Sequence, residues 1–182
     1  MGAGQAGLSA RPVSPRGLLL PRLAQGLTMV EAQGEPNGRV SARVILLSPT
    51  DRVLLIRFVV NRASGEFIFW ATPGGGVEPG ETALAAAQRE LIEELQLQTP
   101  LQGPVHTATN RFEHEGAVIE TRDIFFVGRC EAEAVCLRGV TETERAAMRS
   151  IRWWTADELA QTNETVFPED LAQTLRRLSP AS

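Results

Sequence analysis

Three glutamates at helical spacing are the residues of this sequence most suited to chemistry. Glu90, Glu93 and Glu94 lie within a run of good helix formers. Because a helix turns by about 100° per residue, their side chains fall within one sector of its surface. Carboxylates gathered on one face repel each other unless a cation compensates them. Magnesium prefers carboxylate oxygens together with water and substrate phosphate oxygens, so the pattern predicts a Mg²⁺ site.

A glycine segment and an arginine complete the pattern. Gly74, Gly75 and Gly76 precede the acids, and without side chains they let a ligand approach the backbone and reach a carbonyl oxygen. Arg89 stands four residues before Glu93 and can hold that carboxylate in position. The chemistry that fits is attack by a metal-activated water on a phosphorus atom, with a glutamate accepting the proton.

The acids require a helix, and the sequence around them predicts one. Thr82 is suited to cap the N-terminus, and residues 83–95 are nearly all good helix formers. The side chains expected to form the apolar face recur at helical spacing, and they are Leu84, Ala87, Leu91 and Leu95. The three glutamates then lie away from this face.

Apolar runs predict strands on both sides of this helix. We expect the first two strands to form a hairpin and residues 73–76 to form a loop, because Pro and Gly disfavour regular structure. The expected strands are residues 40–47, 53–60, 67–70, 105–110, 117–127 and 150–154, and further helices are expected over residues 157–162 and 169–178. Strands around a central helix, with another helix at the end, predict a mixed α/β sandwich.

The length of the chain suits one domain. Of its 182 residues, 39–182 are expected to form a single domain with a proper core. Residues 1–38 are rich in Gly, Ala, Pro, Ser and Arg, and we expect them to be a disordered extension. This extension faintly resembles an organelle transit peptide, and a translation start at Met29 is the other interpretation.

Charge and composition exclude several classes of function. The formal net charge is -4, and an acidic body argues against stable nucleic-acid binding, which needs a basic surface over the phosphates. No apolar run has the length of a membrane span, so no membrane partner is expected. Cys130 and Cys136 are spaced too widely for a redox pair. Two free, buried or half-buried thiols predict a reducing cytoplasm as the location.

The spacing of the acidic and glycine residues resembles the Nudix box, Gly-x5-Glu-x7-Arg-Glu-U-x-Glu-Glu-x-Gly-U, in which U is an aliphatic residue. Gly75 leads to Glu81 and then to Arg89, and the remaining positions follow up to Leu97. Every defined position matches except the last glycine, which is Gln96 here. We expect this substitution to affect how the helix ends, at about 1 kcal/mol for a non-glycine residue in a left-handed cap, and not to remove a ligand.

The resemblance to the Nudix family implies a fold, a reaction and a set of site residues. It implies an α/β/α sandwich with a mixed central β-sheet, and hydrolysis of a nucleoside diphosphate linked to another moiety with Mg²⁺ or Mn²⁺. The groups that would bind the metal or its water are the carboxylates of Glu90, Glu93 and Glu94 and, nearby, the backbone carbonyl of Gly74. Arg89 and Glu81 would orient these glutamates. Homodimers are common in the family, so a homodimer is one alternative for the assembly.

The resemblance leaves the general base open, because family members differ in which glutamate accepts the proton. Within the helix the candidates are Glu93 and Glu94. In the later segment the candidates are Glu142 and Glu144, and behind them Glu120, which is also a candidate metal ligand. Arg111 and Arg122 are candidates for contacts to a substrate phosphate.

Two functions of the folded domain stay open from the sequence, and a third possibility is that the arginine-bearing N-terminal extension recruits a partner or a membrane. The first is an active hydrolase acting on a small nucleotide-type substrate, either a nucleoside triphosphate or a nucleotide sugar. The second is a catalytically weak domain of the same fold that senses a nucleotide or acts as a scaffold. Loss of box glutamates would favour the second, and none is lost.

Overall fold

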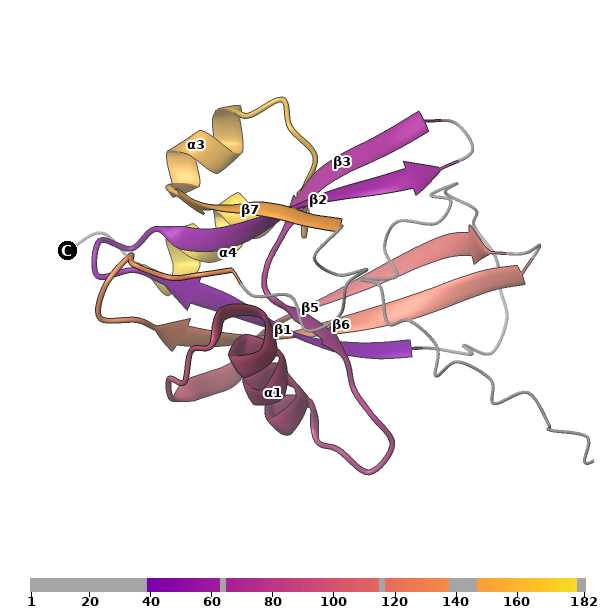
Figure 1. Cartoon of the computed structure of the whole chain (residues 1–182), viewed down its shortest axis with the longest axis horizontal. Helices are drawn as coiled ribbons and strands as arrows, with labels where there is room; N and C mark the ends of the chain where they lie inside the picture. The colour runs from indigo at the N-terminus through magenta and orange to yellow at the C-terminus, as the bar shows by residue number, and fades with distance from the viewer. Residues whose placement is uncertain (1–38, 63–64, 115–116, 138–146, 180–182) are drawn as a thin grey trace, which may run out of the picture.

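A curled, mixed β-sheet with helices on both faces forms the centre of the computed structural model, which describes residues 39–62, 65–114, 117–137 and 147–179 (Figure 1). The strands are β1 (Arg39–Leu47), β2 (Val53–Arg62), β3 (Gly65–Ala71), β4 (Gly74–Gly76), β5 (Leu101–His114), β6 (Ala117–Arg129), β7 (Met148–Trp154) and β8 (Val166–Phe167). The helices are α1 (Ala83–Leu95), α3 (Ala156–Gln161) and α4 (Leu171–Leu178). The predicted extension over residues 1–38 lies outside the described residues.

The sheet is mixed because β1 runs parallel to β6 and β3 runs parallel to β8, while the other neighbours are antiparallel. The strand order is β5-β6-β1-β2-β3-β8, with β4 paired to β1 and β7 paired to β2. The predicted hairpin of β1 and β2 is present, but its only registered pair is Leu47 with Val53. Beyond that pair the two strands separate, and one edge of β1 becomes open to another strand.

The glycine segment fills this open edge. Gly74, Gly75 and Gly76 form β4, which pairs antiparallel with Ser41–Arg43 of β1. The preceding strand, β3, pairs with β2. The chain therefore changes its pairing partner from β2 to β1 within the two residues that separate β3 from β4. The prediction of a loop is therefore wrong for residues 74–76. Pairing with a strand distant in sequence outweighs the low strand propensity of glycine.

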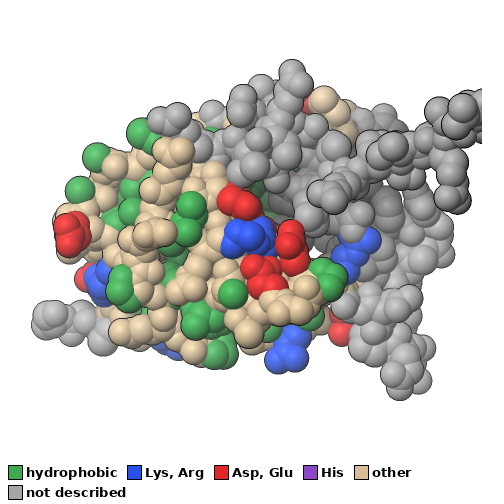
Figure 2. Space-filling model, turned by 60° about the horizontal axis from the view of Figure 1, so that its bottom comes forward, with side chains coloured by type: hydrophobic (Ala, Val, Ile, Leu, Met, Phe, Trp, Pro, Cys, Tyr) green, Lys and Arg blue, Asp and Glu red, His purple; other side chains and the backbone are tan. Residues whose placement is uncertain are grey.

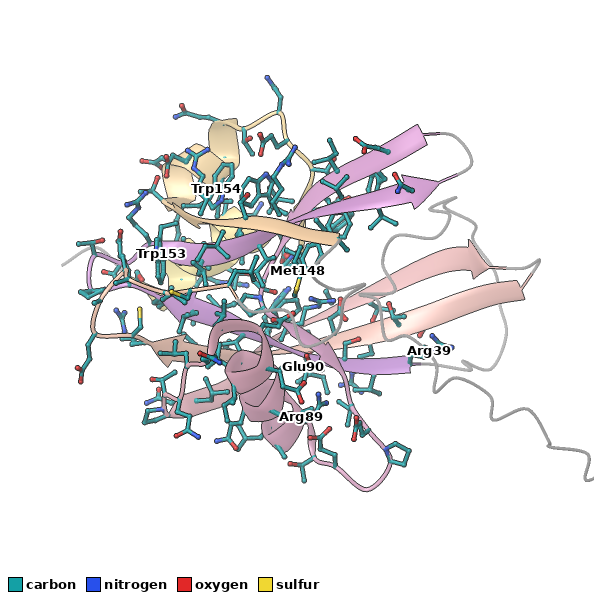
Figure 3. The ribbon with its side chains drawn as sticks, viewed as in Figure 1. Arg39, Arg89, Glu90, Met148, Trp153 and Trp154 are labelled. Carbon is teal, nitrogen blue, oxygen red and sulfur yellow. The ribbon has the colours of Figure 1, made fainter. Side chains whose placement is uncertain are left out.

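Two hydrophobic clusters lie on the two faces of the sheet. Helix α1 contributes Leu91 and its neighbours to one cluster, and α3 and α4 contribute Leu159 and Leu171 to the other. Trp153 and Trp154 lie on opposite sides of β7, and each is buried in a different cluster (Figure 3). Helices thus cover both faces of a mixed sheet, and the predicted α/β/α sandwich is confirmed.

Most predicted elements are present with shifted ends. The helix predicted over residues 83–95 has those bounds. Its apolar face is wrong at Leu84, which is 38% exposed, because the helix turns Ala86 and Ala87 toward the sheet instead. Helix α4 begins at Leu171, after its cap residue Asp170. Among the described helices, none has the length and apolar character needed to cross a membrane.

The two cysteines are only partly as predicted. Both are free, and Cys130 is buried at the end of β6. Cys136 is exposed and lies outside any strand. The prediction of a buried or half-buried side chain is therefore wrong for Cys136, because the chain after β6 runs over the surface at that point.

Candidate functional site

Helix α1 carries the acidic residues between a side-chain cap and a left-handed end. The Thr82 hydroxyl oxygen accepts a hydrogen bond from the Ala85 amide at 3.1 Å, which is the predicted N-cap. At the other end, Gln96 has φ 52° and ψ 34°, and its N–H donates to the Ile92 carbonyl at 2.8 Å. The left-handed cap predicted from the missing glycine is thus present, with glutamine in the conformation that glycine adopts most readily.

Arg89 lies at the centre of the acidic group. Its Nε and Nη2 atoms donate to the two carboxylate oxygens of Glu81, each at 3.1 Å. Its Nη1 atom donates to Glu90 at 2.8 Å and to Glu93 at 3.1 Å. Nη2 also donates to the Gly76 carbonyl at 3.0 Å. A basic side chain enclosed by acidic ones is visible on one face of the molecule in Figure 2.

The hydrogen bonds between Arg89 and Glu81 are the largest cause of the pKa shifts of these two residues. The bonds from Arg89 hold the pKa of Glu81 below its ordinary value. The same bonds raise the pKa of Arg89 further above its ordinary value. Glu81 and Arg89 are therefore both ionised at neutral pH, and together they tie the turn before α1 to the first half of the helix.

Glu90 lies against the glycine strand. Figure 3 shows Glu90 and Arg89 beside each other on α1. A Cβ atom on Gly75 would meet Glu90 Oε1 at 2.4 Å, so only glycine leaves room for this carboxylate. The Glu90 side chain is 15% exposed. Burial raises its pKa above the ordinary value, and the hydrogen bond from Arg89 offsets part of that effect.

Glu94 is joined to the glycine strand directly. The Gly74 N–H donates to Glu94 Oε2 at 2.9 Å, and the glutamate is 7% exposed. Gly74 has a φ of +133°, and a Cβ atom there would meet the Ala42 carbonyl oxygen at 2.2 Å. Glycine is therefore required at this position both by the backbone conformation and by the close approach of β1.

The chemistry of these donors fits a hard divalent cation, which prefers carboxylate and carbonyl oxygens. Glu90 and Glu93 each accept a hydrogen bond from Arg89 Nη1, so the positively charged guanidinium lies between these two carboxylates. In residues 39–62, 65–114, 117–137 and 147–179, no three acidic, histidine or cysteine side chains are grouped so that they could hold one ion. In this structure the carboxylates of Glu90 and Glu93 contact Arg89, and the carboxylate of Glu94 contacts the Gly74 amide.

The other predicted site residues lie farther along the chain. Glu120 is half-buried and Arg122 is exposed, both in β6. By strand alternation they lie on the same face as Phe126, which packs in the cluster under α1. The backbone of Arg111 pairs with Glu120 across β5 and β6. The candidates outside the described part of the chain are Glu142, Glu144 and the side chain of Arg111.

Arg43 is a buried arginine beside the glycine strand, and it is not among the site residues predicted from the sequence. Arg43 and Asp123 are each 4% exposed, and Arg43 Nε lies 3.7 Å from Asp123 Oδ1. A signal for this pair exists, because Arg43 interrupts the otherwise apolar second half of β1. Charged side chains are almost never fully buried unless they are paired.

Comparison with known proteins gives one family match. The family model described as NUDIX domain matches residues 38–178. This range includes every element of the structure from β1 to α4. No curated protein sequence matches the chain.

Solved structures share the fold at low sequence identity. The MutT protein from Methanosarcina mazei Go1 is similar with 19% identity and a TM-score of 0.59, over 81% of this chain and 96% of that protein. The dihydroneopterin triphosphate pyrophosphohydrolase of E. coli is similar with 23% identity and a TM-score of 0.55, over 76% and 92%. A C. elegans Ap4A hydrolase is similar with 17% identity and a TM-score of 0.51, over 78% and 95%. These likenesses establish a common fold.

Proposed function

Because the chain belongs to the NUDIX domain family, we propose that it is a pyrophosphohydrolase that cleaves a diphosphate linkage in a nucleoside diphosphate joined to another moiety. The observation that carries the proposal is the junction between the acidic helix and the glycine strand. Gly74 donates its N–H to Glu94, and Gly75 leaves room for Glu90. Carboxylates and a backbone segment without side chains thus lie together, which supports a site for a phosphate-bound cation.

A divalent ion is the cofactor of the proposed reaction, Mg²⁺ first and Mn²⁺ as the alternative. The groups that would hold it are the Gly74 carbonyl and the carboxylates of Glu90, Glu93 and Glu94, with Glu120 as a further candidate. When bound, such an ion lowers the pKa of a water molecule and neutralises charge on phosphoryl oxygens. Arg89 and Glu81 hold the helix acids in fixed positions through the hydrogen bonds described above.

One glutamate is proposed to accept the proton of the attacking water. Glu93 and Glu94 are the candidates on α1, and Glu142 and Glu144 are the candidates from the segment before β7. Such a base needs to reach the water through a hydrogen bond. Arg111 and Arg122 are proposed to contact the phosphates of the substrate, because arginine binds phosphate oxygens through two parallel hydrogen bonds.

The proposed partner is a small nucleotide-type molecule. The acidic composition supports the prediction that nucleic acid is not bound stably. The cytoplasmic location, the single domain over residues 39–182 and a homodimer remain predictions. Sedimentation of the purified chain measures the assembly directly.

A substrate panel with identified products tests the proposal. Purified full-length chain is incubated with Mg²⁺ and with nucleoside triphosphates, nucleotide sugars, dinucleoside polyphosphates and capped RNA. Dihydroneopterin triphosphate and Ap4A join the panel because they appear in the names of two proteins of similar fold. We expect at least one compound to release a nucleotide product in Mg²⁺, and no product in excess EDTA.

A second function, nucleotide sensing without turnover, is favoured by one observation. The helix acids contact Arg89 and the Gly74 amide, and no group of three could hold an ion among the described residues. Calorimetric titration separates the two functions. Tight nucleotide binding with every compound of the panel left intact would support the sensor and contradict the hydrolase.

A further inference from the structure

Arg43 is a buried cation at the back of the glycine strand. It lies in β1 directly opposite Gly74 of β4, and opposite Phe125 of β6 on the other edge. Its side chain is 5% exposed. Placing a guanidinium out of water is unfavourable unless hydrogen bonds and an opposite charge compensate it. The contacts of Arg43 therefore indicate what this charge is used for.

A single nitrogen of Arg43 joins both ends of the bend that leads into β4. Nη1 donates to the Thr72 carbonyl at 3.1 Å and lies 3.4 Å from the Gly74 carbonyl oxygen. Between these two carbonyls, the Pro73 carbonyl accepts the Val44 N–H at 2.9 Å. Three consecutive carbonyl groups are therefore held by β1, and two of them are held by one side chain.

The remaining part of the guanidinium faces an acid. Arg43 Nε lies 3.7 Å from Asp123 Oδ1 and makes no hydrogen bond to any described residue. Asp123 is on β6, whose backbone pairs with the whole length of β1. Asp123 thus holds the guanidinium from the edge of β1 that pairs with β6, opposite the edge that pairs with β4.

Gly74 is held on both sides of its α-carbon. Its N–H donates to Glu94 of α1 at 2.9 Å, and its carbonyl oxygen lies beside Arg43. A carbonyl oxygen has two lone pairs, so a contact with Arg43 leaves one available to another partner. With φ at +133°, Gly74 adopts a conformation that is open to glycine and strained for other residues, so its contacts determine the directions of its N–H and carbonyl groups.

We propose that Arg43 is a positioning residue that, together with Asp123, orients the Gly74 carbonyl for the divalent ion. This inference rests on the proposed function, in which that carbonyl is a metal ligand. Arg43 acts through Gly74 and does not touch the ion or the substrate. Partners of this kind typically change metal affinity by about 10- to 100-fold when they are removed.

Mn²⁺ binding without substrate tests the proposal. The unmodified chain, Arg43→Lys and Arg43→Met are titrated with MnCl₂, and free Mn²⁺ is measured by electron paramagnetic resonance. A lysine keeps the charge but cannot contact both carbonyls and Asp123, because its single nitrogen lacks the fork of a guanidinium. We expect the dissociation constant for Mn²⁺ to rise about tenfold in Arg43→Lys and further in Arg43→Met. The matched control is Arg129→Lys, whose ion pair with Asp51 is exposed and in which Mn²⁺ binding should be unchanged.

Amide exchange measured by NMR on metal-free protein provides a second readout. In Arg43→Lys the Gly74 amide should exchange about tenfold faster, while the Val53 amide in the core should exchange at its original rate. A uniform increase at both amides would mean that Arg43 only stabilises the fold, and it would overturn the proposal. The lysine variant keeps the test decisive if Arg43→Met does not fold.

The failure of this inference is distinguishable from the failure of the proposed function. A Mn²⁺ dissociation constant within twofold of the original in folded Arg43→Lys and Arg43→Met overturns the role of Arg43, whatever the substrate panel shows. An unmodified chain that binds no Mn²⁺ overturns it as well. A different result would support the role of Arg43 and contradict the hydrolase. In that case the unmodified chain binds Mn²⁺, the affinity falls about tenfold in Arg43→Lys, and every compound of the panel stays intact. In an active enzyme, the apparent activation constant for Mg²⁺ should rise about tenfold in Arg43→Lys, with kcat at saturating Mg²⁺ within about threefold of the original value.

Discussion

The Gly74 amide donates a hydrogen bond to Glu94 Oε2 at 2.9 Å, and this bond joins the strand before the helix to the last acid of the helix. Glu94 is 7% exposed. A buried carboxylate needs hydrogen bonds in place of water, and the Gly74 N–H supplies one of them. This contact therefore fixes the acid relative to the glycine strand, which β1 holds by backbone pairing.

Replacing Glu94 by glutamine should lower turnover while preserving the fold. The amide oxygen of glutamine can still accept the Gly74 hydrogen bond, whereas it cannot serve as an anionic ligand or base. We expect kcat in saturating Mg²⁺ to fall by about two to four orders of magnitude. The rate is measured on the substrate that the panel identifies, with the exposed Glu169→Gln as the control. An unchanged rate in Glu94→Gln would remove this carboxylate from the mechanism.

Adding one methyl group at Gly75 should weaken the metal site specifically. In Gly75→Ala the new Cβ would lie 2.4 Å from Glu90 Oε1, so the carboxylate has to move. Gly80→Ala is the matched control, because φ there is +83° and no atom lies within 4 Å of a new Cβ. The control should lose about 1 kcal/mol of unfolding free energy through backbone strain and keep its Mn²⁺ affinity. Gly75→Ala should lose at least about tenfold in Mn²⁺ affinity; equal affinities in the two variants would contradict the role of this close approach.

Replacing Glu90 by glutamine should stabilise the metal-free protein at neutral pH. Burial raises the pKa of Glu90 above its ordinary value of 4.5. Below that ordinary value the acid is protonated in both the folded and the unfolded chain, and its burial does not reduce the free energy of unfolding. As the pH rises through the folded-state pKa, the unfolded chain releases the proton more readily, so stability is lost.

The measurement for Glu90→Gln is urea denaturation in EDTA at pH 4 and at pH 7. The variant should be more stable than the original chain at pH 7, and the difference should shrink at pH 4. Addition of Mg²⁺ at pH 7 should then stabilise the original chain more than the variant, because a ligand that binds only the folded state stabilises it. A variant that is less stable than the original at pH 7 without metal would show that the Arg89 hydrogen bond outweighs the burial of Glu90.

Replacing Gln96 by glycine should stabilise the helix end without changing the reaction. Gln96 has a φ of 52°, a conformation that costs a non-glycine residue about 1 kcal/mol. Gln96→Gly should therefore raise the free energy of unfolding by about that amount, as measured by urea denaturation. Gln98→Gly, at an exposed position beyond the helix, serves as the control and should not stabilise the fold. A loss of stability in Gln96→Gly would mean that the glutamine side chain contributes more than the backbone strain costs.

The sequence predicted those features that depend on residues close together in the chain. The helix over residues 83–95, its Thr82 cap and the left-handed residue at Gln96 all follow from local propensity and from the spacing of one motif. Arg89 was expected beside Glu93, and it contacts that residue at 3.1 Å. The mixed α/β sandwich followed from the order of the elements, and the mixed central sheet followed from the resemblance to the Nudix family.

The features that escaped prediction depend on residues far apart in the chain. The glycine segment is a strand because β2 leaves β1 after one registered pair, and this separation has no local signature. Arg43 and Asp123 come from β1 and β6, which meet only through parallel pairing. The arginine within an apolar strand was the visible sign of that pair. Glu142 and Glu144 remain candidates, since they lie outside the described residues.

The early separation of β1 and β2 places the acidic group and the outer part of the β2–β3 hairpin on different strands. Glu81, Arg89 and the helix acids bond to one another, to β4 and to the turn before α1, and β4 is anchored on β1. The outer parts of β2 and β3 pair with each other beyond the point of separation. Among the described residues, the hydrogen bonds of the acidic group therefore run through β1, β4 and α1, and sequence changes at the tip of the outer hairpin are expected to leave those bonds in place.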